Sequence, residues 1–351
     1  MKFGNFLFPE SSTPHLDGRI IDETLAEARL SEELGVEVLW LAEHHFDGYC
    51  AYVDPIAFAA VLAAATRRPK IGFAVIQASL HHPIRLAEQL ALIDHISKGR
   101  LIVGLGRGSA YNIYDYQGYG IDHREAQARF EEAEEIILKA WTKERVTHRG
   151  RFWTLDVPML RPRPYTKPHP PIIRSSASEA SLIALARSGR PFLMNVQSNE
   201  TTRQRIELYR RTMGEAGYGE DAIARNLEQS WIWRNVFVAE SDAEAERIAF
   251  PAFQAMQEHR ASLRERVFRE QGVRLKEGPP EEPPARVDPR HALICGSPAT
   301  VAEAMAELAG IGVGGVIAQF RLGPMPHEVA ASSLSLFMRQ VAPAFRGSAA
   351  A

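Results

Sequence analysis

Three groups of side chains in this sequence combine residue types and spacing that chemistry requires. An acid precedes two histidines at residues 43–45, an arginine stands between glycines at residues 106–108, and serines recur at residues 175–178. An imidazole titrates near neutral pH and can move a proton, so His44 is the first candidate for a catalytic group. A forked guanidinium suits a phosphate, so Arg107 is the first candidate for an anion contact.

The serine run predicts an oxyanion site. Ser175, Ser176 and Ser178 are expected at the start of a helix, where free backbone N–H groups and the helix dipole attract an anion. The glycines beside Arg107 let a ligand approach the backbone closely. Together these residues predict a phosphate site. The alternative is an ordinary helix cap next to a surface arginine, because serine is a favoured cap residue.

The histidines leave three interpretations open. His44 is either a catalytic or cofactor-contacting group or a buried structural histidine. A metal site built on His44, His45 and His81 is the third interpretation. Adjacent residues seldom point into one site, and the sequence has no His-Glu-x-x-His spacing. We therefore predict no metal ligand.

Short β-branched or aromatic runs alternate with longer helical patterns along the whole chain. The expected strands are residues 2–8, 36–42, 71–76, 100–105, 171–174, 192–195, 231–239 and 314–319. The expected helices are residues 20–34, 55–66, 83–96, 124–141, 179–188, 202–215, 243–257 and 328–341. Eight strand–helix units in 351 residues favour an α/β fold, a single (β/α)8 TIM barrel over residues 1–351.

A barrel of this kind gathers its active residues on the loops that follow the strands. All three groups follow expected strands, so we expect them on one face. Other polar side chains in the same loops are predicted to contact a substrate, namely His45, Tyr111, Asn112, Asn195 and Gln319. Two insertions interrupt the pattern at about 142–169 and 257–289. The second is charge-dense and rich in proline, which predicts either a solvated linker or a lid over the active site.

Composition excludes several classes of protein. Lysine and arginine total 41 against 43 acidic residues, so the net charge of −2 argues against a nucleic-acid surface or a polybasic membrane anchor. Two cysteines, Cys50 and Cys295, are too few for a disulfide framework and fit a cytoplasmic location. The chain starts without a signal-peptide pattern, and its longest apolar run, residues 55–65, is shorter than the roughly 20 residues that span a bilayer.

Several motifs in order resemble the bacterial luciferase-like flavin-dependent monooxygenases. Residues 34–46, LGVEVLWLAEHHF, are similar to the second-strand signature of that family. Further similarity lies in residues 82–88, 94–108, 295–301 and 319–323. The resemblance covers nearly the whole chain. It implies a TIM barrel that uses reduced FMN and O2 to oxygenate a small organic substrate through a peroxyflavin.

The resemblance also assigns roles to particular residues. His44 corresponds to the imidazole that assists catalysis as a general base or hydrogen-bond partner. The isoalloxazine would lie against Ala74, Val75 and Ile76, with a non-prolyl cis peptide at Ala74–Val75. The phosphate would lie at Arg107, Ser175 and Ser176. A separate flavin reductase would supply reduced FMN, and a homodimer would pack around the second and third helices.

Two departures from the family pattern concern the expected cofactor site. Light-emitting members carry a reactive cysteine where this chain has Gly106, which argues against light emission. They carry an acid where this chain has Ser175, and the preceding Arg174 then becomes a further candidate contact to the phosphate. Three alternatives stay open: hydride transfer with the deazaflavin F420, a metal-dependent TIM-barrel hydrolase, and a flavin-binding protein without catalysis.

Overall fold

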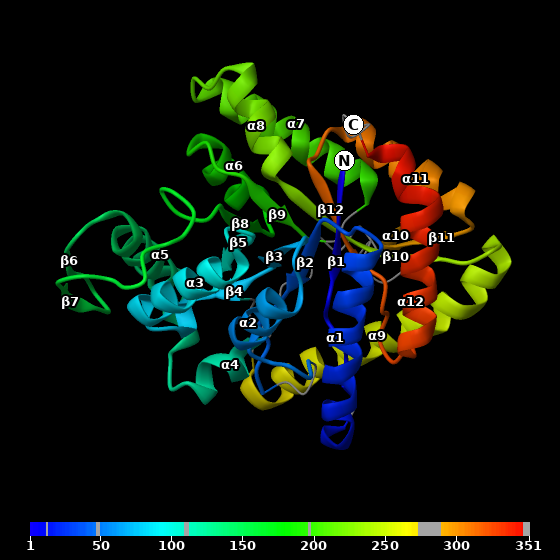
Figure 1. The fold of residues 1–351 in the computed structure, drawn as a ribbon, viewed down its shortest axis with the longest axis horizontal. Helices are drawn as coiled ribbons and strands as arrows, with labels where there is room; N and C mark the ends of the chain where they lie inside the picture. Colours follow the sequence, from blue (N-terminus) through cyan, green and yellow to red (C-terminus); the bar gives the residue numbers. More distant parts are fainter. Residues whose placement is uncertain (12, 47–49, 109–111, 196–197, 273–288, 347–351) are drawn as a thin grey trace.

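A closed ring of eight parallel strands forms the centre of this computed structural model (Figure 1). Its strands, in order around the ring, are β1 (Lys2–Phe6), β2 (Val38–Leu41), β3 (Lys70–Phe73), β5 (Leu101–Gly106), β8 (Ile172–Ser176), β9 (Phe192–Met194), β10 (Trp231–Val238) and β12 (Gly315–Gln319). The structure describes residues 1–351 except 12, 47–49, 109–111, 196–197, 273–288 and 347–351. The predicted barrel and its eight strands are confirmed.

Large and small residues alternate across neighbouring strands inside the ring. The ring of Trp40 is fully buried and packs edge-on against Trp231, with 5.1 Å between the ring centroids. Gly4 and Gly72 flank Trp40 on the two adjacent strands, and a Cβ at either position would collide with the indole. Protein interiors are close-packed, so these glycines create the volume that the tryptophan fills.

Helices cover the outside of the ring. They are α1 (Asp17–Glu33), α2 (Pro55–Ala65), α3 (Pro83–Ser97), α5 (Ala126–Thr142), α6 (Glu179–Arg187), α7 (Asn199–Glu215), α8 (Glu220–Gln229), α9 (Asp242–Gln271), α11 (Pro298–Ile311) and α12 (His327–Leu336), the last continuing as a π-helix over Phe337–Val341. Asp54 caps α2 ahead of a proline at the first helical position, which is a typical helix start. The sequence patterns missed α8 and α11.

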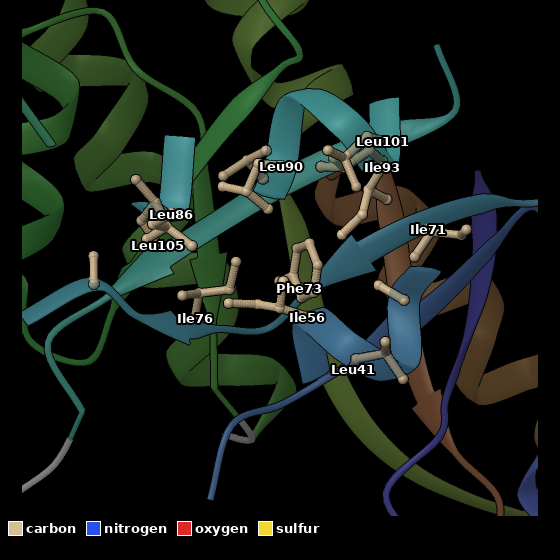
Figure 2. Close-up of a cluster of buried hydrophobic side chains, with 14 of the residues drawn as sticks. Leu41, Ile56, Ile71, Phe73, Ile76, Leu86, Leu90, Ile93, Leu101 and Leu105 are labelled. Carbon is tan, nitrogen blue, oxygen red and sulfur yellow. The ribbon is translucent and has the colours of Figure 1, made fainter. Parts of the chain in front are cut away.

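The expected strand at 71–76 is interrupted. β3 ends at Phe73 and a short strand, β4 (Ile76–Gln77), resumes the pairing with β5. Ala74–Val75 between them is a non-prolyl cis peptide, as the family resemblance implied. Phe73 and Ile76 flank this interruption, and Figure 2 shows both side chains within a cluster of buried hydrophobic residues.

Helix α9 is longer than expected. The patterns ended it at 257, whereas it continues to Gln271. Its charged residues are good helix formers, and a helix of 30 residues is about 45 Å long. Its far end reaches α4 (Ile113–Gly118), where Tyr114 hydrogen-bonds Glu270 and Gln117 donates to Gln271 at 2.7 Å. The described part of the second insertion is therefore helix, along the lower edge of Figure 1.

The first insertion contains a hairpin that sequence patterns did not identify. β6 (Val146–Arg149) pairs antiparallel with β7 (Thr154–Val157), and Glu132 of α5 accepts backbone N–H groups at its turn. One further strand, β11 (Leu293–Gly296), follows the short helix α10 (Pro289–Ala292) and pairs with β10 outside the ring. In the described part of the chain, every helix is too short or too polar to cross a membrane.

Candidate active site

The predicted site residues meet at the carboxyl ends of neighbouring strands. β4 and β8 both pair with β5, and Gln77 lies opposite Gly106 in this register. The loop after β2 joins them because the backbone N–H of Glu43 donates to Val75 O at 3.2 Å. The ends of β2, β4, β5 and β8 thus form one edge of the barrel mouth.

Glu43 is the centre of this edge, although the sequence analysis assigned it no role. Its carboxylate is buried, with 1% of the side chain exposed. One oxygen, Oε1, binds His45 Nε2 at 2.9 Å and His81 Nε2 at 2.7 Å. The other, Oε2, accepts the backbone N–H of Gln77 at 2.6 Å, and Glu43 O accepts from the Gln77 side chain at 3.1 Å. Glu43 therefore holds the segment between Val75 and His81 in place.

The two imidazoles keep this carboxylate ionised. Burial alone would raise the pKa of Glu43, but the charge of His81 and hydrogen bonds from His45 and His81 lower it to about 2. Burial would lower the pKa of His81, but the charge of Glu43 and the hydrogen bond to it together outweigh that effect and raise the pKa. The result is a buried ion pair behind the predicted flavin-contact segment.

His45 belongs to this support and not to a substrate pocket. Its side chain is 9% exposed, and Nδ1 lies 3.3 Å from the hydroxyl of Tyr119 while Nε2 is held by Glu43. A side chain bound at both nitrogens and buried has no face for a substrate. The prediction that His45 contacts substrate is therefore corrected.

His44 points the other way and is half-buried. Its ring lies against Phe8, with 5.0 Å between ring centroids, and its Nδ1 is 3.4 Å from Asn112 Nδ2. Asn112 is 5% exposed and also donates to Asp115 Oδ2 at 3.2 Å. Asn112 thus supports His44, which corrects its prediction as a substrate contact.

The predicted phosphate groups lie beside this edge. Arg107 and Ser175 are exposed, and among the described residues Arg107 forms no ion pair. Gly106 lets the side chains of Val75 and Ser175 approach the backbone of β5 closely: a Cβ there would lie 2.6 Å from Val75 Cγ2 and 2.9 Å from Ser175 Oγ. Ala74 and Val75 are partly exposed on the same side.

The other serines do not lie where the sequence placed them. Ser175 and Ser176 end strand β8 instead of starting a helix, and side chains alternate along a strand. Ser176 is 2% exposed and binds Ser181 at 3.0 Å, so its prediction as a cofactor contact is corrected. Ser178 is the cap of α6, in a capping box with Ser181. Its hydroxyl is engaged, so α6 offers an anion its dipole and not this side chain.

Arg174 already has partners in the described structure. The alternation that directs Ser175 toward the mouth turns Arg174 outward, where it forms an ion pair with Glu134 of α5 and covers the ring of Phe130 at 4.9 Å. Arg190 binds the same carboxylate at 2.9 Å. The guanidinium of Arg174 is therefore engaged in the outer layer, and its contact to a phosphate stays a prediction.

The remaining candidates divide into three cases. The side chains of Ile76 and Gln319 are fully buried, and both residues stay predictions. Gln319 donates to Arg321 O at 3.0 Å. Asn195 is half-buried directly after β9 and stays a prediction. Tyr111 lies outside the described residues.

The histidines do not form a metal site in the described structure. His45 and His81 direct their Nε2 atoms at one oxygen of Glu43, and His44 lies on the other side of the loop against Phe8. Across the described ranges, no three His, Cys, Asp or Glu side chains are arranged to hold an ion. The arrangement therefore gives no support to a metal-dependent hydrolase.

Comparison with known proteins places this edge in a family. The model of the luciferase-like monooxygenases matches residues 1–314. The chain belongs to this family. One relative is the alkanal monooxygenase alpha chain of Photorhabdus laumondii, 30% identical over 62% of this chain and 60% of its own length. Another is the oxygenase component of flavin-dependent trigonelline monooxygenase from Acinetobacter baylyi, 31% identical over 49% of this chain and 48% of its own. The chain spans less than two thirds of the length of the curated relatives that it matches.

Solved structures of this luciferase-like fold superpose over nearly the whole chain. Monooxygenase RslO1 from Streptomyces bottropensis has a TM-score of 0.84 and 29% identity, over 99% of this chain and 100% of that one. The oxygenating constituent of 3,6-diketocamphane monooxygenase from Pseudomonas putida, solved with FMN, has a TM-score of 0.77 and 19% identity over 98% of each chain. The second likeness shows the fold alone.

Proposed function

We propose that this protein is a flavin-dependent monooxygenase that uses reduced FMN and O2 to oxygenate a small organic substrate. The observation that carries the proposal is that the exposed Arg107 and Ser175 lie on either side of Gly106, next to the partly exposed Ala74 and Val75. A guanidinium and a hydroxyl together suit a phosphate, and Ala74 and Val75 offer an apolar surface to a planar ring. Membership of the luciferase-like family supports the same conclusion.

Each group at the barrel mouth has a task in this proposal. Arg107 and Ser175 hold the phosphate, and the partly exposed Ala74 and Val75 lie against the ring system. His44 touches the reacting molecules. Bound FMN supplies the redox chemistry with O2. The protein excludes water and orients the substrate, for which α9 beside α4 is placed.

Binding of reduced FMN, measured anaerobically by fluorescence titration, tests the proposal together with O2-dependent product formation from candidate substrates. Arg107→Ala is expected to weaken binding about 10–100-fold, because a charge-assisted hydrogen bond contributes about 1.5–3 kcal/mol. His44→Ala is expected to change binding less than Arg107→Ala and to reduce product formation. Arg149→Ala, an exposed arginine on β6, is the matched control. Equal losses of affinity for Arg107→Ala and His44→Ala would contradict the assigned roles.

A parallel titration with F420 separates the main alternative. The deazaflavin transfers hydride without O2, so tight binding of F420 and O2-independent turnover would replace the monooxygenase proposal. Undetectable binding of both cofactors would reject flavin chemistry altogether. Binding of FMN without turnover of any substrate would favour a flavin-binding protein that lacks catalysis.

We propose in addition that a separate reductase supplies the reduced FMN and that the chain forms a homodimer through α2 and α3. The outward faces of these adjacent helices expose Val61, Leu92 and Ile96, at 46%, 52% and 38%. Neighbouring exposed apolar side chains favour a protein contact. Light scattering of Leu92→Glu, expected to be monomeric where the unmodified chain is dimeric, tests the interface.

A further inference from the structure

The contact between His44 and Asn112 determines which nitrogen of His44 carries its proton. Asn112 occupies the cap position of α4, but its side chain makes no capping bond. Its amide nitrogen instead lies 3.4 Å from His44 Nδ1 and 3.2 Å from Asp115 Oδ2. The first contact is long, as catalytic hydrogen bonds often are before a ligand binds. Asn112 is 5% exposed, so water does not readily compete for either contact.

Asp115 decides how the amide of Asn112 is oriented. The carboxylate is fully buried and accepts hydrogen bonds from Gln77 Nε2 at 2.6 Å and from the backbone N–H of His45 at 3.3 Å. An ionised carboxylate only accepts, so the end of the Asn112 amide that faces it must be the NH2 group. Amide orientation is otherwise ambiguous, and here the acceptor removes the ambiguity. The same NH2 group then presents its second hydrogen to His44 Nδ1.

We propose that Asp115, acting through Asn112, holds His44 in the tautomer whose proton is on Nε2. A neutral imidazole has one N–H and one lone pair, so a ring that accepts at Nδ1 donates from Nε2. His44 therefore meets an oxygen of the substrate or cofactor as a hydrogen-bond donor and not as a general base. Asn112 and Asp115 are positioning residues, because they act only through His44. This inference rests on the proposed function for the identity of the oxygen that His44 meets.

The tautomer is measurable without any cofactor. In cofactor-free protein labelled with 15N-histidine, the ring nitrogens of each histidine separate into protonated and unprotonated types, and loss of signals in His44→Gln assigns those of His44. We expect the proton on Nε2 in the unmodified chain. Asn112→Ala removes the donor, so both tautomers should appear. Gln117→Ala on the same helix α4, whose side chain contacts Gln271, is the matched control and should leave the spectrum of His44 unchanged.

Asn112→Asp provides a test of opposite sign. Two adjacent carboxyl groups share a proton, and that proton lies between Asp115 and the new side chain. The oxygen that replaces the NH2 group faces both Asp115 and His44, and its remaining lone pair accepts from His44, so the proton should move to Nδ1. Far-UV circular dichroism checks that each variant folds. A proton on Nδ1 in the unmodified chain, or the same tautomer in Asn112→Ala and Asn112→Asp, would overturn the inference.

The outcomes separate this inference from the proposed function. If FMN binds and product forms but His44 carries its proton on Nδ1, the inference is wrong and the monooxygenase proposal stands. If the proton is on Nε2 but neither flavin binds, the hydrogen-bond chain is correct and the proposed reaction is wrong. Reduced product formation in Asn112→Ala with unchanged FMN affinity would agree with both.

Discussion

The two polar regions of the barrel mouth are built in opposite ways. Around Glu43 the polar side chains are buried, and the carboxylate has partners on both oxygens. Around Gly106 the polar side chains of Arg107 and Ser175 are exposed. A buried satisfied network fixes geometry at a cost in desolvation that its own bonds offset. Exposed polar groups stay available to a ligand, so the comparison separates residues that shape the site from residues proposed to bind its ligand.

The largest effect is expected where the comparison predicts a loss of stability. Glu43→Gln replaces one oxygen by an NH2 group, which must then face either the N–H of Gln77 or the two imidazoles. Removing one partner of a buried ion pair costs about 3–5 kcal/mol, and urea unfolding measures the loss. Glu135→Gln, a half-exposed residue paired with Lys139, is the control and should change stability by less than about 1 kcal/mol. Equal unfolding midpoints for Glu43→Gln and the unmodified chain would show that the Glu43 ion pair does not stabilise the fold.

Acid should protonate Glu43 and break its interactions with His45 and His81 in a defined range of pH. The pKa of Glu43 is about 2 when folded against an ordinary value of 4.5. The ion pair therefore stabilises the fold above pH 4.5, by about 3 kcal/mol at neutral pH, and this contribution is lost as the pH falls toward 2. His81 has a raised pKa, so part of the same stabilisation is also lost as the pH rises through that value. Urea midpoints across pH 2–6 should fall more steeply for the unmodified chain than for Glu43→Gln.

A side chain at Gly106 should weaken binding and leave the Glu43 network intact. Gly106→Ala puts a methyl group within 2.6 Å of Val75 and 2.9 Å of Ser175, so both side chains must move from the positions in which they are proposed to meet FMN. Overpacking of this kind costs about 1–3 kcal/mol, and because it displaces two proposed contacts we expect a loss of about 10–100-fold in FMN affinity by fluorescence titration. Gly18→Ala on α1, where nothing lies within 4 Å, is the matched control. Unchanged affinity for Gly106→Ala would show that the flavin ring does not lie beside Gly106.

We expect the smallest loss of FMN affinity from the removal of a single hydroxyl group in the exposed region around Gly106. Ser175→Ala removes one donor from the proposed phosphate contact, worth about 1 kcal/mol or ~5-fold in affinity. The fold should be unaffected because the side chain is exposed. Ser188→Ala, at the far end of α6, controls for the loss of a serine. If Ser175→Ala lowered the urea midpoint as much as Glu43→Gln does, the proposed difference between a supporting and a ligand-binding region would be wrong.

The sequence predicted the barrel because eight short strands and the helices between them leave periodic patterns. It ended α9 too early because a charged, mostly exposed helix lacks an apolar stripe, so the charge density there predicted an insertion, either a solvated linker or a lid. The serine pair was misplaced for a related reason. On a helix start both hydroxyls could face an anion, whereas on a strand Ser175 and Ser176 must face opposite ways.

Glu43 was missed because nothing near it in the chain defines its role. Its partners Gln77 and His81 are 34 and 38 residues away, and only the closure of the barrel brings them together. The histidines next to it look more reactive in isolation. Arg107 could be proposed from the sequence because a cation between glycines indicates its chemistry without tertiary context, and its contact to a phosphate stays a prediction. Candidates for ligand binding were thus easier to propose from the sequence than residues that support the site.

The two halves of helix α9 differ in how many of their side chains are buried. Its first half buries Ala245, Ala249, Phe253 and Met256, whereas from 257 to 271 Val267 is the single buried residue of this described segment. The contacts of the far half to α4 are exposed and polar. Segments with few buried contacts unfold locally at a small fraction of the global free energy. We therefore expect the far half of α9 to separate from α4 at a lower free-energy cost than any opening of the barrel, so that its backbone amides exchange with solvent faster than those of the first half.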